Sequence, residues 1–480
     1  MPTKDRQQKI TVVGAGLAGS ECALQLANLG YSIVLYEMRS QVMTEAHRTG
    51  KYGELVCSNS FGSVSDESAP GALKWEAEQL NSQILQSGVQ AQVPAGQALG
   101  VDRERFSEII TEKVQAHPHI EVRTELIQSL ADIPRPAVIA TGPLTHESLS
   151  RSLQNHFGDE FLYFFDAIAP IIDTDSINFD IAWKADRYDK GTPDYINCPL
   201  DKEQYEHLIQ EIQMARKIEP KHFETTAFFE GCMPIETMVA RGPETPRFGP
   251  MKPVGLRNPR TGKEAHAIVQ LRQDNTAATA YNMVGFQTRM AYGEQTRVFR
   301  MIPGLEQAEF LKLGSIHRNL FINSPKRLNA DLSSKSDPWL FFAGQITGVE
   351  GYFESTCIGL LVSRFLDQKI RGAKFSPPPR ESAMGSLLTA ITDESRAENF
   401  QPTNINFGLF PHLTEENGKK IRDKKEKKRR QLQLARQAFS LWAESQNETP
   451  NGALSKDFSL KMMSFSAGSQ AEKSASLHKS

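Results

Sequence analysis

The sequence predicts an α/β fold, with a parallel sheet in one domain and a smaller α+β domain inserted into that domain. Three observations carry this prediction. A strand, a glycine-rich turn, a helix and a second strand follow one another from Ile10 to Glu37. Two later apolar runs, at 137–142 and 339–344, each end at a glycine, as buried parallel strands often do. Between them, residues 161–325 form short runs interrupted by Gly and Pro, which is typical of a mixed α+β unit.

The first unit has the length that a right-handed crossover between parallel strands needs. Residues 10–13 are β-branched and apolar, and they stop at Gly14. Residues 20–29 carry apolar side chains at helical spacing up to Gly30, and 32–36 read as a second strand that ends at Glu37.

The turn in this unit has the Gly-x-Gly-x-x-Gly pattern, which is a weak signal alone but a strong one between a strand and a helix. Its first glycine permits a tight turn, its second lets a pyrophosphate approach, and its third lets the helix pack on the strand. The acid that follows the second strand can accept hydrogen bonds from a ribose. The predicted dinucleotide-binding residues here are Gly14, Ala15, Gly16, Leu17, Ala18, Gly19 and Glu37.

This pattern does not itself distinguish FAD from NAD. The run at 339–344 leads into a second glycine-rich loop, 344–351, which an ordinary buried strand would not require. We expect this strand to return beside the first one, so that Gly344 and Gln345 meet the cofactor. The sequence therefore favours FAD and a Rossmann-type FAD-binding domain.

The predicted domain boundaries follow from these segments. The FAD-binding domain takes 1–100 and 330–411 together with the strand at 137–143, and the inserted α+β domain takes 150–325. Residues 71–87 have the spacing of one amphipathic helix. Residues 412–480 are basic at 419–430, then have the pattern of a helix at 432–442, and end in a tail rich in Ser, Lys and Gly. We expect a flexible extension whose basic part is a solvated face rather than an RNA-binding arm.

The composition is that of an ordinary globular protein, with 39% hydrophobic residues and a formal net charge of -2. No apolar run is long enough for a membrane helix, and residues 1–10 lack the features of a signal peptide, so we expect a cytoplasmic protein that does not contact membranes. The five cysteines are scattered without a Cys-x-x-Cys pair, which argues against a redox dithiol, a disulfide framework or a metal site.

Several longer blocks resemble one family, the bacterial folate- and FAD-dependent tRNA (uracil-5-)-methyltransferases, within the wider GidA-like group of flavoproteins. The resemblance runs from about residue 10 to 411. The blocks that carry it are 54–60 (ELVCSNS), 166–170 (DAIAP), 187–191 (RYDKG), 229–236 (FEGCMPIE), 247–253 (RFGPMKP), 270–275 (QLRQDN) and 344–352 (GQITGVEGY).

The resemblance implies a methyltransferase in tRNA processing. Methylenetetrahydrofolate would donate a one-carbon unit to C5 of the T-loop uridine at tRNA position 54. Reduced FAD would supply electrons, NAD(P)H would regenerate the reduced flavin, and no obligatory protein partner is evident. By motif, Cys232 would be the nucleophile at uracil C6 and Cys57 the base near the flavin.

Other residues in the matching blocks are more ambiguous. Cys198 reads as a packing residue because its neighbours are apolar and bounded by proline. Four basic side chains are candidates for phosphate contacts, and each could equally be solvated or paired with an acid. They are Arg241, Arg247, Lys252 and Arg272.

Three other kinds of protein stay open. The related FAD- and folate-dependent enzymes of the wobble uridine share the glycine motifs, but they are longer and end in a sizeable helical domain. A disulfide-reductase type of flavin oxidoreductase would need a close cysteine pair. A flavoprotein that binds RNA without turnover would not need both thiols.

Overall fold

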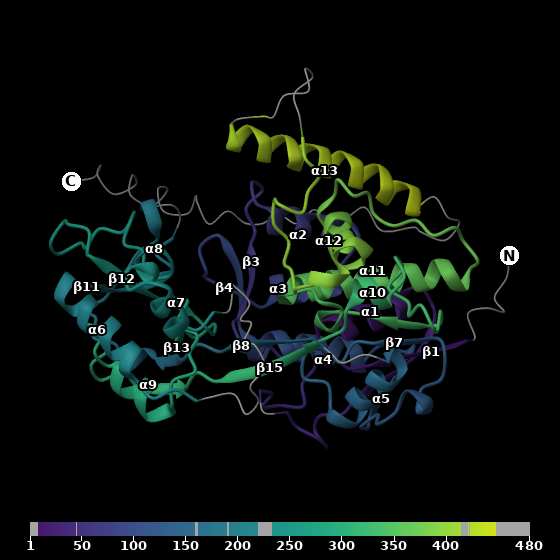
Figure 1. Cartoon of the computed structure of the whole chain (residues 1–480), viewed down its shortest axis with the longest axis horizontal. Coiled ribbons are helices and arrows are strands. Elements are labelled where there is room, and N and C mark those ends of the chain that lie inside the picture. Colours follow the sequence, from purple (N-terminus) through teal and green to yellow (C-terminus); the bar gives the residue numbers. More distant parts are fainter. Residues whose placement is uncertain are drawn as a thin grey trace, which may run out of the picture.

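The computed structural model describes residues 8–44, 46–158, 162–189, 192–218, 233–413, 421 and 423–447. Figure 1 shows two lobes side by side, and the chain enters and leaves the smaller one through neighbouring extended segments. No helix within the described ranges combines the length and the apolar character needed to cross a membrane.

The larger lobe is built on a five-stranded parallel sheet with the order β16-β7-β1-β2-β6. Its strands are β1 (Lys9–Val13), β2 (Ser32–Glu37), β6 (Ile120–Thr124), β7 (Ala137–Ile139) and β16 (Leu340–Phe342). Helices cover both faces of this sheet, so the central strands are apolar on both sides and buried. The predicted α/β class with a parallel sheet is confirmed.

One detail of the prediction is wrong. The late strand β16 does not lie beside β1, because β7 takes that place through the pairing Thr11–Ala137. β16 pairs with β7 on its far side, where Leu340 is opposite Ala137. The loop after β16 still reaches the carboxyl end of the sheet, since all these strands run in the same direction.

The helices of this lobe begin with α1 (Leu17–Asn28), which packs on the long α11 (Tyr352–Ile370). A Cβ atom at Gly359 would overlap the carbonyl of Ala18, so these two helices touch backbone to backbone. The remaining helices are α2 (Ala69–Gln79), α3 (Gln83–Gln90), α4 (Arg103–Gln115), α5 (Glu147–Phe157), α10 (Ser324–Arg327) and α12 (Ala383–Thr392).

The single helix predicted over 71–87 is two helices. Asn81, between α2 and α3, has a φ of 59°, a left-handed conformation that ends the first helix. Ser82 then caps α3 by accepting a hydrogen bond from the N–H of Leu85. The apolar spacing runs through this break because both helices pack on the same core.

Two small sheets connect the parts of the molecule. An antiparallel sheet has the order β3-β5-β4, and an antiparallel pair, β8 with β15, links the lobes. These strands are β3 (Ser60–Ser63), β4 (Gln92–Val93), β5 (Ala98–Val101), β8 (Leu162–Ala167) and β15 (Ile316–Phe321).

The smaller lobe contains a six-stranded antiparallel sheet with the order β10-β11-β12-β13-β9-β14 and a hydrophobic core of its own. The strands are β9 (Ile171–Asp173), β10 (Trp183–Lys184), β11 (Tyr195–Leu200), β12 (Ala267–Gln273), β13 (Ala280–Met283) and β14 (Phe310–Lys312). The helices are α6 (Lys202–Met214), α7 (Ile235–Arg241), α8 (Thr245–Phe248) and α9 (Tyr292–Phe299).

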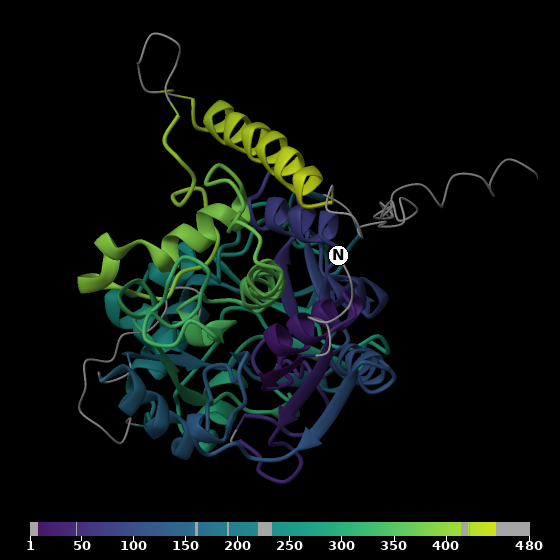
Figure 2. The ribbon, with the colours of Figure 1, turned by 90° about the vertical axis from the view of Figure 1, so that its right-hand side faces the viewer.

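Within the extension predicted for 412–480, the helix expected at 432–442 is part of a longer helix, α13 (Lys424–Asn447), which is packed rather than flexible. α13 lies over α2 at the edge of the larger lobe (Figures 1 and 2). Its basic first turns are exposed, but Leu432, Ala435, Phe439 and Trp442 are buried in the main core. An apolar stripe at helical spacing therefore fixes the helix in place. The rest of the predicted extension lies outside the described residues.

Candidate active site

A cleft opens at the carboxyl ends of the parallel strands. This is the edge at which open α/β sheets bind ligands. Of the residues predicted to bind a dinucleotide, Gly14, Gly16, Leu17, Ala18, Glu37, Gly344 and Gln345 line the cleft. Ala15 and Gly19 do not line it, and they support the turn from behind.

The glycines of the first turn have separate roles. Gly14 has a φ of 100°, and a Cβ there would lie 2.6 Å from the carbonyl oxygen of Ala140. A Cβ at Gly19 would overlap the carbonyl of Gly14, so the helix is as close to the turn as a backbone permits. Gly16 is different, because, apart from its own chain neighbours, none of the described residues has an atom within 4 Å of the place of its Cβ.

Gly16 is also the N-cap of α1, and no side chain caps the first N–H groups of this helix. Those N–H groups and the helix dipole favour an anion at this point. The open space over Gly16 therefore fits the pyrophosphate of a dinucleotide.

Glu37, at the end of β2, is buried and already hydrogen-bonded. Its carboxylate accepts hydrogen bonds from the backbone N–H of Ala15 (2.8 Å) and from the backbone and guanidinium of Arg39 (3.0 and 2.9 Å). Burial would raise the pKa of Glu37, but the charge of Arg39 and these hydrogen bonds outweigh it and hold the pKa below its usual value. A ribose would thus meet an ionised, rigidly held acceptor.

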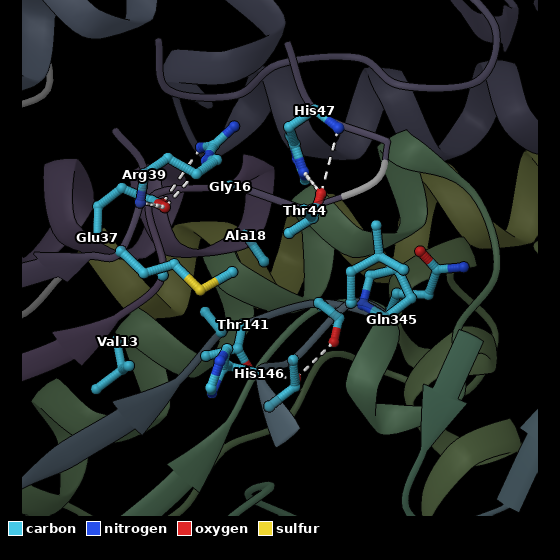
Figure 3. Close-up of a pocket in the computed structure, with 18 of the residues that line it drawn as sticks. Val13, Gly16, Ala18, Glu37, Arg39, Thr44, His47, Thr141, His146 and Gln345 are labelled. Atoms are coloured by element: carbon cyan, nitrogen blue, oxygen red, sulfur yellow. Dashed lines mark hydrogen bonds and ion pairs between the residues drawn. The ribbon is translucent and has the colours of Figure 1, made fainter. Parts of the chain in front are cut away.

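Other polar side chains in the cleft were not predicted from the sequence. In Figure 3, Glu37 and Arg39 lie on one side of the cleft, Gln345 on the other, and Thr44 and His47 along a third wall. His47 Nδ1 lies 2.7 Å from Thr44 Oγ1. Burial, followed by the charge of Arg39, lowers the pKa of His47 to about 4, so its imidazole is neutral at neutral pH.

The second glycine-rich loop, 344–351, forms another wall of the cleft, next to the N-terminal end of α1. Gly344 has a φ of 81°, and a Cβ there would lie 2.7 Å from the Cβ of Ala18. Gln345 is held by its amide, which donates a hydrogen bond to Glu350 (2.6 Å). The two predicted loops thus meet, although they are more than 300 residues apart in sequence.

Cys57 is half-buried where the two lobes meet, next to this cleft. Its backbone N–H donates a hydrogen bond to the phenolic oxygen of Tyr352 (2.7 Å), and Tyr352 is part of the cleft wall. Its Sγ lies 3.8 Å from the carbonyl oxygen of Ala167, the last residue of β8. The thiol is therefore placed by both the cofactor-binding lobe and the segment that leads into the smaller lobe.

Three cations surround the segment that carries Cys57. Arg103 donates hydrogen bonds to the carbonyls of Cys57 (2.8 Å) and Leu55 (2.7 Å), and Lys312 donates to the carbonyl of Val56 (3.0 Å). Burial, together with the charges of Arg103 and Arg48, lowers the pKa of Lys312 to about 8.

The third cation is Arg272, one of the predicted phosphate contacts. It donates a hydrogen bond to the side-chain oxygen of Asn59 (3.0 Å), and burial lowers its pKa. This contact joins β12 of the smaller lobe to the Cys57 segment. Arg272 is thus a component of the junction between the lobes rather than an outward-facing cation.

The remaining cysteines occupy different environments. Cys198 in β11 is fully buried, and burial raises the pKa of its thiol, as the packing interpretation requires. Cys22 and Cys357 are buried as well, in α1 and α11, and burial raises the pKa of both. Cys232, the predicted nucleophile, lies outside the described residues. Among the residues that are described, no cluster of His, Cys, Asp or Glu could hold a metal ion.

These features define a class. A parallel sheet, a glycine turn with an open helix N-terminus, an acid after the second strand and a late glycine loop together form a dinucleotide-binding α/β protein. A sequence model of the family described as "Glucose inhibited division protein A" matches residues 9–374.

Similar proteins narrow this class further. The chain is 74% identical over 437 residues to a protein of Bdellovibrio bacteriovorus named methylenetetrahydrofolate--tRNA-(uracil-5-)-methyltransferase TrmFO, covering 91% of this chain and 98% of that protein. A protein of the same name from Natranaerobius thermophilus is 52% identical over 421 residues, which is 88% of this chain and 97% of that protein. The chain therefore belongs to the TrmFO family, and the resemblance found in the sequence is confirmed.

A solved structure agrees on the fold. The GidA protein of Aquifex aeolicus, in its form II crystal, superposes with a TM-score of 0.63 and 15% sequence identity, covering 93% of this chain and 76% of that chain. At this identity the likeness concerns the fold alone.

Proposed function

We propose that this protein is a cytoplasmic enzyme that forms 5-methyluridine at position 54 in the T-loop of tRNA. Methylenetetrahydrofolate donates the carbon, reduced FAD provides the electrons, and NAD(P)H regenerates the reduced flavin. The names of the relatives support the folate donor, the tRNA substrate and the C5 position of uracil. The cleft supports the flavin.

The cleft residues fit FAD on two grounds. The open N-terminus of α1 at Gly16 suits the pyrophosphate, and the ionised Glu37 suits a ribose. Gly344 and Gln345 bring the second loop to the same cleft. When bound, reduced FAD supplies the hydride that converts a methylene group on uracil into methyl.

The thiols account for the remaining chemistry. Uracil C5 is a poor nucleophile until a group adds at C6, and a thiolate is suited to add there and to leave later. We assign this addition to Cys232. The sulfur–C6 bond forms, C5 attacks the methylene carbon of the folate, and one of the two C–N bonds of that carbon breaks, its nitrogen taking a proton. The second C–N bond breaks, and the other nitrogen takes a proton, when C5 loses its own proton.

Cys57 is the base in this proposal. The C5 proton must leave before an exocyclic methylene can form, and the base that takes it must lie near both substrate and cofactor. After reduction of that methylene, the bond from sulfur to C6 breaks and the C5–C6 double bond is restored. Arg103, Lys312 and Tyr352 orient the Cys57 backbone for this step through the hydrogen bonds described above.

The observation that carries the proposal is the hydrogen bond between Cys57 and Tyr352. The backbone N–H of Cys57 donates it, so a half-buried residue that carries a thiol lies at the wall of the cofactor cleft. The other described cysteines are buried in packed elements. The target uridine must swing out of its stack to reach this point, so base flipping is also expected.

The test is transfer of isotopically labelled carbon from methylenetetrahydrofolate to unmodified tRNA, with the purified chain, NADPH and no other protein. Label found as 5-methyluridine at position 54 supports the proposal. Label at the wobble position identifies the related wobble-uridine activity instead. Absence of label with FAD bound contradicts methyl transfer and favours an oxidoreductase or an RNA-binding flavoprotein. Cys57→Ser and Cys232→Ser then assign the two thiols.

A further inference from the structure

Phe248, the last residue of α8 in the smaller lobe, is 74% exposed, more than any other large hydrophobic residue described. α8 lies at the outer edge of this lobe, well away from α9 (Figure 1). A ring that is this exposed offers a flat apolar face on which another ring can stack.

The ring of Phe248 is presented by a well-anchored segment. Pro246 and Met251, on either side of it, are buried, and the N–H of Met251 donates a hydrogen bond to the carbonyl of Pro246 (2.8 Å). The N–H of Ile268 in β12 donates to the carbonyl of Met251 (3.0 Å), which attaches the segment to the central sheet of the lobe. The exposure is therefore a property of a fixed turn, not of a loose loop.

The charge of this segment is strongly positive. Residues 241–257 contain Arg241, Arg247, Lys252 and Arg257 but only one acid, Glu244, in a chain whose formal net charge is -2. The guanidinium of Arg247 lies 5.2 Å from the centre of the Phe248 ring and forms an ion pair with Glu244 (2.6 Å). Lys252 is exposed and has no ion-pair partner among the described residues.

The surface beside the ring is concave. A hollow next to Phe248 is lined by Gly242, Pro243, Glu244, Thr245 and Gly249. A second aromatic side chain, Tyr188, is 58% exposed and packs against Gly255 farther along the same segment. Flat rings, a hollow and a segment of net positive charge match an unpaired nucleotide, whose base has two stacking faces and whose phosphate is an anion.

We propose that Phe248 is a stacking platform for an unpaired base of the RNA, and that Arg247 and Lys252 bind its neighbouring phosphates. The inference rests on the proposed function for the identity of the RNA, a tRNA. α7 begins three residues after Cys232 in sequence and leads directly into the segment that carries Phe248. A tRNA loop bound there would contact a segment that is close in sequence to the predicted nucleophile, Cys232.

The experiment measures binding of an unmodified tRNA transcript to the FAD-loaded full chain by fluorescence anisotropy. Phe248→Ala should weaken binding about tenfold, within the range found for loss of one stacked base. Phe248→Tyr should restore it, because the ring remains. Tyr292→Ala is the matched control, since Tyr292 is also exposed (57%) on the same lobe, at α9. Lys252→Met should lower the slope of log affinity against log salt by about 0.7 to 0.9.

The inference is overturned if Phe248→Ala and Tyr292→Ala bind tRNA with the same affinity. This holds whether both variants bind like wild type or both lose the same affinity. Loss of a dimer on Phe248→Ala, with tRNA binding unchanged, also overturns it and assigns the surface to a second copy of the chain. Binding is measured without turnover. Wild-type protein that binds tRNA through Phe248 but transfers no labelled carbon would therefore contradict the proposed function and support this inference.

Discussion

Arg103, the first residue of α4 in the larger lobe, forms a two-pronged ion pair with Asp274 after β12 in the smaller lobe. Its Nε lies 3.0 Å from Oδ2 and its Nη2 3.0 Å from Oδ1. The two side chains are only 15% and 8% exposed. Since the same guanidinium holds the carbonyls of Leu55 and Cys57, one residue links the contact between the lobes to the position of the thiol.

Arg103→Met should therefore reduce both stability and activity. Removing one partner of a buried pair leaves the other charge uncompensated, which costs about 3 to 5 kcal/mol. We expect a lower denaturation midpoint in urea and slower methyl transfer. Arg105→Met is the control, because Arg105 is on the same helix but 54% exposed. Equal midpoints for the two variants would contradict the structural role of Arg103.

The glycine turn gives a second prediction, a contrast between neighbouring glycines. A Cβ at Gly16 would point into space that the described residues leave open, whereas a Cβ at Gly19 overlaps the carbonyl of Gly14. Gly16→Ala should fold normally yet bind FAD at least about tenfold more weakly, a loss of 1.4 kcal/mol. Gly19→Ala should destabilise the flavin-free protein itself by about 1 to 3 kcal/mol.

Both variants are compared as flavin-free proteins, since bound FAD adds stability of its own. Flavin affinity is read from titration of the flavin fluorescence, and folding from circular dichroism on heating. A Gly16→Ala protein with wild-type flavin affinity would show that the pyrophosphate does not lie over this glycine.

The local parts of the fold could be predicted from the sequence. The β1–α1–β2 unit is specified by a contiguous pattern, because the strand, the turn glycines and the helix adjoin in sequence. Gly344 and Gln345 followed from a second pattern of the same kind. The helix expected at 432–442 had a local signal as well, since Leu432, Ala435, Phe439 and Trp442 recur at helical spacing. The spacing alone does not show that this helix packs on the main core.

The surroundings of Cys57 could not be predicted in this way. Arg103, Lys312 and Tyr352 contact its segment from 46, 256 and 295 residues away in sequence. No periodicity connects such residues. Arg103 and Tyr352 come from α4 and α11 of the same lobe, and Lys312 comes from β14 of the smaller lobe, so their proximity depends on the path of the whole chain. The predicted position of β16, beside β1, was wrong for a related reason. Which strand lies next to β1 depends on the path of the whole chain.

Burial of Glu76 gives a prediction about pH. The Glu76 carboxyl in α2 accepts hydrogen bonds from the N–H groups of Ala383 and Met384 (2.7 Å each), yet burial raises its pKa to about 8. The unfolded chain ionises this group near pH 4.5, so the folded state binds an extra proton between pH 4.5 and 8. Stability that is fully present below pH 4.5 is thus lost as pH rises to 8.

Glu76→Gln removes this dependence while keeping a carbonyl acceptor. From pH 6 to 9 the wild type should lose about 3 kcal/mol of stability relative to the variant, since one pKa unit corresponds to about 1.4 kcal/mol. Urea denaturation at the two pH values measures this difference. Lys74, whose burial lowers its pKa to about 8, is present in both proteins and cancels in the comparison. Parallel pH curves for wild type and variant would contradict the raised pKa of Glu76.

The last prediction concerns α13 as a component of the fold. The Phe439 ring is fully buried and packs on Trp75 of α2 and on Trp442, with ring centres 6.2 and 5.2 Å apart. Phe439→Ala should lower the free energy of unfolding by about 3 to 5 kcal/mol, the usual cost of a buried aromatic residue. Leu441→Ala is the control, since Leu441 is 63% exposed on the same helix and should change stability by less than about 0.5 kcal/mol.

Limited proteolysis distinguishes the two possible results for this helix. Loss of the Phe439 ring should release α13 and make its backbone susceptible to trypsin, because the helix is rich in Lys and Arg. The Leu441 variant should remain as resistant as wild type, since its buried face is intact. Equal cleavage of all three proteins within α13 would mean that the helix does not dock on α2 in solution, and the basic segment would then be the flexible extension that its composition first indicated.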